Sequence, residues 1–178
     1  MKALHLLPIG NVDPGLLEWL RQELIEGFRI PCEIVDPPLD PAFAFHPERD
    51  QFHSSEILER LHEYVRPRTW RLLAITPVDL YIPILTFVFG EAELGGTCSV
   101  VSYHRLRQEF YGLPQDAPLL GRRLLTECIH EIGHTLELIH CQDYRCVMAS
   151  SHAVEWIDLK DWTFCPDCAA KAEAHAQF

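Results

Sequence analysis

Two histidines four residues apart, His130 and His134, constrain this chain more than any other feature of its sequence. In an α-helix such residues lie about one turn apart on the same face, so both imidazoles can reach one metal ion. Zinc binds imidazole nitrogen readily, and a catalytic zinc keeps three protein ligands and a fourth position for water. The spacing therefore predicts a helix that carries a zinc-dependent hydrolytic site.

His140 is the expected third ligand. At about 100° per residue, it lies roughly 240° around a continuous helix from His134 and would point away from the metal. The helix must therefore end or bend sharply between His134 and His140.

Glu131 lies beside the two histidines and is the expected general base. Zinc lowers the pKa of its bound water toward about 7 and polarises a substrate carbonyl. Glu131 would take the proton from that water and pass it to the leaving amine. Because the HExxH pattern also arises by chance, the third histidine is what strengthens the prediction of peptide-bond hydrolysis.

A second metal site is predicted from four cysteines. Cys141 and Cys146 are separated by four residues, and Cys165 and Cys168 by two. Two such pairs supply a closed tetrahedral zinc site that holds a small subdomain together, although free thiols or a redox pair remain alternatives. Since Cys141 adjoins His140, this structural zinc would also support the third catalytic ligand.

Composition excludes several kinds of partner. The 178 residues include 15 basic and 26 acidic side chains, a formal charge of −11, which argues against nucleic acid. No apolar run approaches the roughly 20 residues that span a membrane, and residues 1–8 are too short for a leader. Seven cysteines without an export signal favour metal or free thiols over disulfides. We expect one domain, soluble and cytoplasmic, without a removable pro-segment.

The remaining pattern predicts an α/β chain. Residues 3–9 and 28–35 are expected strands around a helix that begins at an Asp13 cap and ends at Gly27, which forms a βαβ unit. Ser54 or Ser55 is expected to cap a second helix, followed by a strand at 71–76. A long helix after residues 114–118 leads into the metal residues.

The apolar stretch from residue 80 to residue 103 is expected to form two strands around a turn. Residues 86–90 are either an exposed edge strand, to which an extended peptide can add by main-chain hydrogen bonds, or part of a core hairpin. The sequence leaves both alternatives open.

Over its last third, the chain resembles a known family. The pattern HExxHxxxxxH, followed directly by Cys141 and then by Cys146, Met148 and the pair Cys165 and Cys168, looks like that of the archaemetzincins of the metzincin clan. The resemblance implies a metzincin-like zinc metalloprotease fold. Its parts are a mixed twisted sheet with an antiparallel edge strand at the cleft, an active-site helix and a C-terminal subdomain held by zinc.

The resemblance also implies roles for individual residues. His130, His134 and His140 match the catalytic zinc ligands, and Glu131 matches the general base. Met148 falls at the methionine of a tight turn beneath the zinc, and an ordinary core methionine is compatible with that role. The four cysteines match the ligands of a second zinc. The implied division is residues 1–140, with the active-site helix, and residues 141–178, with the methionine turn and the cysteine site.

One position departs from the family pattern. Metzincins have glycine three residues after the second histidine, where this chain has Glu137. Either Glu137 adopts the left-handed conformation at a cost of roughly 1–2 kcal/mol, or the turn forms differently. The Glu137 carboxylate there has two possible roles. It either perturbs zinc binding, as a competing ligand or by pairing with a ligand histidine, or it is a solvated residue of the turn.

Two functions remain open from the sequence. The first is a zinc metallopeptidase acting on a peptide or protein substrate. The alternative is a non-catalytic, zinc-stabilised binding protein that keeps the fold with a weakened catalytic site. The sequence does not determine the substrate, endopeptidase or aminopeptidase action, or the oligomeric state.

Overall fold

A mixed five-stranded sheet organises the computed structural model, which describes residues 1–175. Its strand order is β2-β1-β5-β8-β7, in which the edge strand β7 runs antiparallel to β8 and the other neighbouring strands are parallel. A small second sheet has the order β3-β4-β6. The strands are β1 (Ala3–Pro8), β2 (Cys32–Ile34), β3 (Phe45–His46), β4 (Gln51–His53), β5 (Thr69–Thr76), β6 (Leu80–Tyr81), β7 (Gly90–Ala92) and β8 (Cys98–Ser102). The expected α/β fold with an antiparallel edge strand is confirmed.

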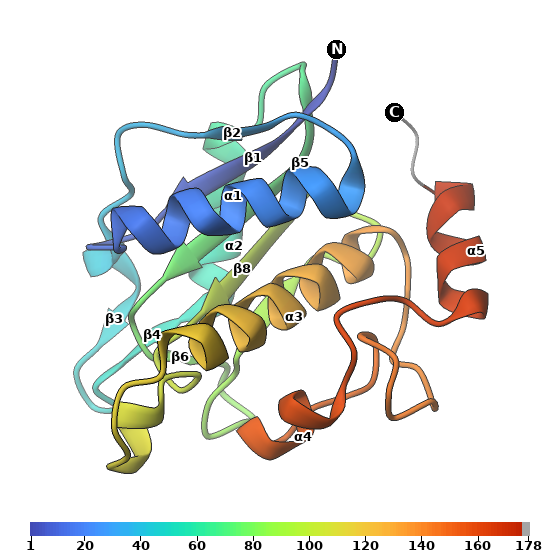
Figure 1. The fold of residues 1–178 in the computed structure, drawn as a ribbon. Helices are drawn as coiled ribbons and strands as arrows, with labels where there is room; N and C mark the ends of the chain where they lie inside the picture. Colours follow the sequence, from blue (N-terminus) through green and yellow to red (C-terminus); the bar gives the residue numbers. More distant parts are fainter. Residues whose placement is uncertain (176–178) are drawn as a thin grey trace.

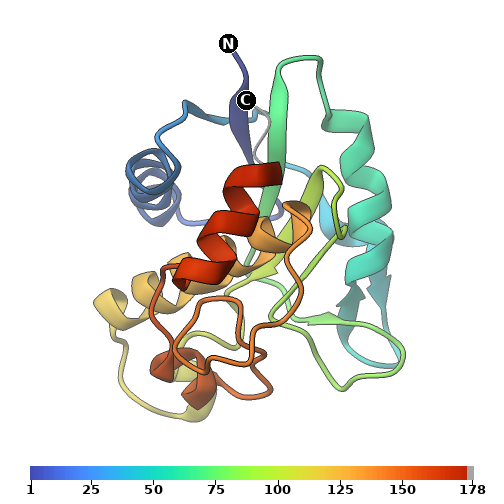
Figure 2. The same ribbon diagram turned by 90° about the vertical axis from the view of Figure 1, so that its right-hand side faces the viewer.

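Helices cover both faces of the large sheet. The helices α1 (Pro14–Phe28) and α3 (Ala117–Thr135) lie on one face, and α2 (Ser54–Leu61) lies on the other (Figures 1 and 2). The short helices α4 (Val154–Leu159) and α5 (Pro166–His175) follow α3, and 3₁₀ turns occupy Pro41–Ala44, His62–Tyr64 and Gln108–Tyr111. Side chains alternate along the strands: Leu6 and Leu73 pack toward α1 and α3, whereas Leu7 and Leu72 join the other apolar cluster.

The βαβ unit forms as predicted, with small differences at its boundaries. Asp13 caps α1 by accepting a hydrogen bond of 2.7 Å from the Leu16 amide. The predicted end at Gly27 is wrong, because α1 continues to Phe28 and Arg29 takes the left-handed conformation, with φ of 55°. The amide of Arg29 closes the last turn on the Ile25 carbonyl. The second strand is consequently shorter than predicted and contains only Cys32–Ile34.

The predicted serine cap of α2 is also wrong. The helix starts at Ser54, and its N-cap residue is His53, which makes no capping hydrogen bond with its side chain. The hydroxyls of Ser54 and Ser55 instead donate to the carboxylate of Glu91 on β7. The serine hydroxyls therefore form hydrogen bonds with a residue distant in sequence, whereas the sequence pattern predicted hydrogen bonds with the nearby helix backbone.

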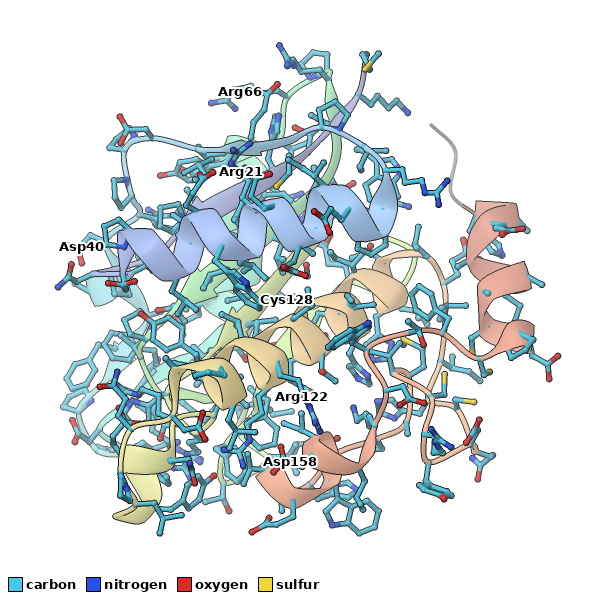
Figure 3. The ribbon with its side chains drawn as sticks, viewed as in Figure 1. Arg21, Asp40, Arg66, Arg122, Cys128 and Asp158 are labelled. Atoms are coloured by element: carbon cyan, nitrogen blue, oxygen red, sulfur yellow. The ribbon has the colours of Figure 1, made fainter. Side chains whose placement is uncertain are left out.

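Helix α3 is anchored on both sides. Cys128 of α3 is fully buried in the apolar cluster that also contains residues of α1, and Figure 3 places it on the side of α3 that faces α1. On the outer side, Arg123 forms a bidentate ion pair with Asp158 of α4, with distances of 2.8 and 2.6 Å, and Arg122 donates to the Asp158 carbonyl (Figure 3). Among the described helices, none has the length and apolar character needed to cross a membrane.

Candidate metal centre and active-site cleft

The three predicted histidines come together at the end of α3. The Nε2 atoms of His130 and His134 are 3.1 Å apart. The ring of His140 lies 5.4 Å from that of His130 and 5.0 Å from that of His134, measured between centroids. One nitrogen from each ring lies within 4.8 Å of the others. The helix ends at Thr135, so the chain does turn between the second and third histidines.

That turn is made at Glu137, which has a φ of 63°. Of the two alternatives, the chain adopts the left-handed conformation without a glycine. The amide of Leu138 then reaches back to the Gly133 carbonyl at 3.1 Å. The Glu137 carboxylate lies 3.5 Å from Nδ1 of His175 and beside Gly95, and it does not belong to the histidine cluster.

Hydrogen bonds fix the tautomers of the two helical histidines. Nδ1 of His130 contacts the Val147 carbonyl at 2.8 Å, and Nδ1 of His134 contacts the Leu138 carbonyl at 2.7 Å. A carbonyl only accepts, so each Nδ1 carries the proton and each Nε2 of a neutral ring presents a lone pair. Two lone pairs 3.1 Å apart repel unless a cation lies between them. Tetrahedral zinc–nitrogen bonds of about 2.1 Å separate two ligand atoms by about 3.4 Å, so these residues fit zinc.

Electrostatics favour neutral imidazoles at this site. Burial lowers the pKa of His130 well below its ordinary value and also lowers the pKa values of His134 and His140. Metal ligands must be deprotonated, and a lowered pKa keeps them so over a wider pH range.

Glu131 lies buried against the edge strand. It is 5% exposed, and a Cβ at Gly90 would lie 2.7 Å from its Oε1 atom and 2.8 Å from the Val100 carbonyl. Only glycine at position 90 leaves room for this carboxylate. Burial, followed by the charge of Glu127, raises the pKa of Glu131 well above its ordinary value. A bound divalent cation would oppose this shift by stabilising the carboxylate.

A cleft of about 690 Å³ opens in front of these residues. Its walls include β7 and the segment of residues 85–89 on one side and Ser150, Ser151 and His152 on the other. The sequence left open whether residues 86–90 form an edge strand or part of a core hairpin; the edge strand contains Gly90–Ala92, so it shares only Gly90 with that segment. Residues 86–89 form the cleft wall, with the Val88 amide bonded to the Leu80 carbonyl at 2.9 Å. A groove of about 1110 Å³ near α1 and α3 contains none of the predicted site residues.

Two functional candidates were missed from the sequence: Glu127 and Lys160. They form an ion pair of 3.3 Å in which the side chains are 4% and 1% exposed. Nζ of Lys160 also donates, at 3.3 Å, to the Val147 carbonyl, the same oxygen that fixes His130. Glu127 precedes Glu131 by four residues on α3 and lines the cleft, so its helical spacing was a usable signal. The sequence contains no comparable spacing for Lys160, because only the tertiary fold brings Lys160 close to Glu127.

Met148 lies directly against the active-site helix. It is fully buried, and a Cβ at Gly133 would overlap its Sδ atom. Gly133, between the two histidines, therefore allows the methionine to pack beneath them.

The four predicted cysteines also form one cluster, with all Sγ atoms within 4.8 Å of one another. Cys141 and Cys165 have Sγ atoms 3.9 Å apart, close to the roughly 3.8 Å that zinc–sulfur bonds of about 2.3 Å give in a tetrahedron. Burial raises the pKa of the Cys146 thiol, and the amides of Met148 and Cys165, which donate to its sulfur at 3.5 and 3.3 Å, oppose this by stabilising the thiolate. The donor set fits a structural zinc.

Comparisons with known proteins agree on one family. Residues 48–174 match the model of Peptidase family M54. The archaemetzincin of Methanocaldococcus jannaschii is 45% identical over 168 residues, which cover 93% of this chain and 90% of that protein.

Solved structures give the same assignment. The archaemetzincin from Archaeoglobus fulgidus, complexed with malonate, is 34% identical with a TM-score of 0.82 over 95% of this chain and 99% of that one. A zinc-dependent peptidase from Methanocorpusculum labreanum is 30% identical with a TM-score of 0.85 over the same shares. The chain therefore belongs to the archaemetzincins, peptidase family M54, a family of zinc metallopeptidases.

Proposed function

We propose that this chain hydrolyses peptide bonds with a zinc held by His130, His134 and His140 and with Glu131 as general base. The observation that carries the proposal is the pair of Nε2 lone pairs 3.1 Å apart, which the Nδ1 hydrogen bonds to Val147 and Leu138 hold in place. This arrangement of the two rings favours a cation bound between them.

The residues around the histidines support the chemistry of hydrolysis. When bound, zinc supplies a Lewis acid that polarises the scissile carbonyl and lowers the pKa of a coordinated water toward about 7. Glu131 accepts the proton from the attacking water and transfers it to the leaving nitrogen. Its burial beside Gly90 keeps it next to the reacting atoms and shields the proton transfer from bulk water.

The edge strand supports an extended peptide as substrate. The strand β7 pairs with β8 on one side only in the large sheet, and Gly90, Glu91 and Ala92 line the cleft. An extended chain adds to such an edge by main-chain hydrogen bonds, which hold the backbone without demanding a particular sequence. Side-chain selectivity would come from the apolar wall formed by residues 85–89.

A second zinc at the four cysteines is part of the same proposal. Cys141 follows His140, so a metal there would hold the third catalytic ligand in position. None of the seven cysteines is in a disulfide bond, which is typical of a reducing compartment, and we propose a cytoplasmic location.

A metal count combined with a peptide-library digest tests the function. Zinc-reconstituted wild type is expected to hold about two zinc ions per chain and to cleave peptides, whereas Glu131→Ala is expected to hold the same zinc without cleaving. Equal turnover by the two proteins would contradict the role of Glu131. One zinc, lost only when the cysteines are changed, would instead support the non-catalytic binding protein.

A further inference from the structure

A second group of histidines lies outside the catalytic cluster, on the small sheet. His46 ends β3, His53 ends β4, and Glu56 lies in the first turn of α2. The Oε1 atom of Glu56 lies 3.1 Å from Nε2 of His46 and 3.0 Å from Nδ1 of His53. One ligand atom from each residue therefore lies within 4.8 Å of the others.

From this arrangement we infer that His46, His53 and Glu56 form a binding site for a further divalent transition metal of the zinc class. Two imidazoles and one carboxylate are ligands that zinc, copper and nickel accept, whereas magnesium prefers an all-oxygen shell. Metal–ligand bonds of about 2.1 Å in a tetrahedron separate ligand atoms by about 3.4 Å. The observed contacts of 3.0 and 3.1 Å need to widen by only a few tenths of an ångström.

Tyr81 organises these ligands in advance. Its ring stacks on His53 at 5.2 Å with an angle of 25° between the planes, and it meets His46 edge-on at 5.7 Å. The opposed strands β3 and β4 place the two histidines on one hairpin, with His46 paired to Gln51. Fewer side-chain rotations need to be frozen when the metal binds, which favours affinity.

The site is open to solvent and connected to the cleft. The side chains of His46 and Glu56 are 44% and 39% exposed, so an ion can enter and solvent can complete its coordination. His53 is followed by Ser54, which holds Glu91 in the cleft, and Tyr81 begins the segment that leads to the cleft wall. Metal binding would therefore stiffen the side of the molecule that carries the edge strand.

Hydrogen bonding alone is the competing explanation, and it makes a different prediction. Without metal, the rings of His53 and His46 both donate hydrogen bonds to the Glu56 carboxylate. These hydrogen bonds hold the pKa of Glu56 below its ordinary value. A metal requires the opposite tautomers, with lone pairs facing the carboxylate. Only a metal site at His46, His53 and Glu56 would bind one additional metal ion per chain, and that binding would depend on all three residues.

Isothermal titration of the zinc-reconstituted full chain with Zn²⁺ tests the inference, after its starting metal content has been measured. We expect one additional equivalent per chain and none with Mg²⁺. The additional equivalent should be lost in His53→Asn and in Glu56→Gln, each with unchanged circular dichroism. His62→Asn is the matched control: His62 forms a group with Glu93 and Cys98 that contains only one histidine, and burial raises the pKa of the Cys98 thiol to about 12, which disfavours it as a ligand, so this variant should keep the equivalent.

A wild-type titration that matches that of His53→Asn would overturn the inference, as would equal loss in His62→Asn. The starting metal content and peptide cleavage report on the proposed function separately, since none of these three variants changes a residue of the catalytic cluster. The melting temperature gives a second measurement: added Zn²⁺ should raise it in wild type and in His62→Asn more than in His53→Asn.

Discussion

Lys160→Met should destabilise this protein more than most single changes, because it leaves the Glu127 carboxylate buried without its partner. The pair is 3.3 Å apart. Coulomb's law with an effective dielectric constant of about 20 gives an attraction of about 5 kcal/mol, and breaking buried pairs typically costs about 3–5 kcal/mol. Methionine keeps the length and most of the volume of lysine, so packing changes little. We expect the free energy of unfolding to fall by about 3–5 kcal/mol at pH 8.

The pH dependence of that loss identifies its cause. Burial raises the pKa of Glu127, and the charge of Lys160 opposes this. Removing Lys160 therefore raises the pKa further. A carboxyl group with a raised pKa in the folded state contributes its full stability at low pH and loses it as the pH rises through that pKa. The deficit of Lys160→Met relative to wild type should be smaller at pH 5 than at pH 8.

Urea denaturation of zinc-saturated protein at both pH values measures these differences. The control is Glu127→Gln/Lys160→Met, which removes both charges and should recover most of the loss. If the double variant is as unstable as Lys160→Met at pH 8, then lost packing rather than the unpaired charge is responsible, and the reasoning fails.

Three further predictions concern the active-site helix and its surroundings. Gly90→Ala should lower kcat for peptide cleavage by about 100-fold with zinc retained, because the new methyl group displaces Glu131. The control Ala92→Gly, on the same strand, should change kcat little in the same peptide assay. Equal losses of kcat in the two variants would contradict this prediction. Glu137→Gly should raise the free energy of unfolding by about 1 kcal/mol by relieving the left-handed strain, and Glu137→Ala, which keeps the Cβ, should give no such gain in urea denaturation. Burial lowers the pKa values of His130, His134 and His140, so the three rings stay neutral below the ordinary histidine pKa of 6.5. The zinc affinity of the histidine site should therefore change little from pH 8 to pH 6.5 and should fall below pH 6.5. A decline in affinity centred at or above pH 6.5 in a competition titration would refute this prediction.

Local geometry explains which parts of the site the sequence predicted. The spacing of His130 and His134 on one helical face and the need for a turn before His140 follow from helix geometry alone. The αβ order and the predicted cap at Asp13 are similarly local, and the Asp13 carboxylate accepts from the Leu16 amide at 2.7 Å. These features require no knowledge of the tertiary fold.

The features that were missed depend on distant partners. Ser54 was expected to cap its own helix, but Glu91, 37 residues later, takes its hydroxyl. Residues 86–89 have the apolar composition of a strand, yet they form the cleft wall, and the edge strand starts only at Gly90. Lys160 reaches Glu127 across 33 residues of chain. Hydrophobic periodicity carries no information about such pairings.

The carbonyl of Val147 gives the two proposed metals a common support. Val147 lies between Cys146 and Met148, its oxygen receives hydrogen bonds from both His130 and Lys160, and its amide donates to Thr163 at 3.1 Å. Zinc at the cysteines would fix this peptide and, through it, the orientation of His130. Binding free energies at coupled sites are reciprocal, so each metal would tighten the other by the same factor. Loading is then expected to be cooperative, and a chelator that strips the cysteine site should also loosen zinc at the histidines.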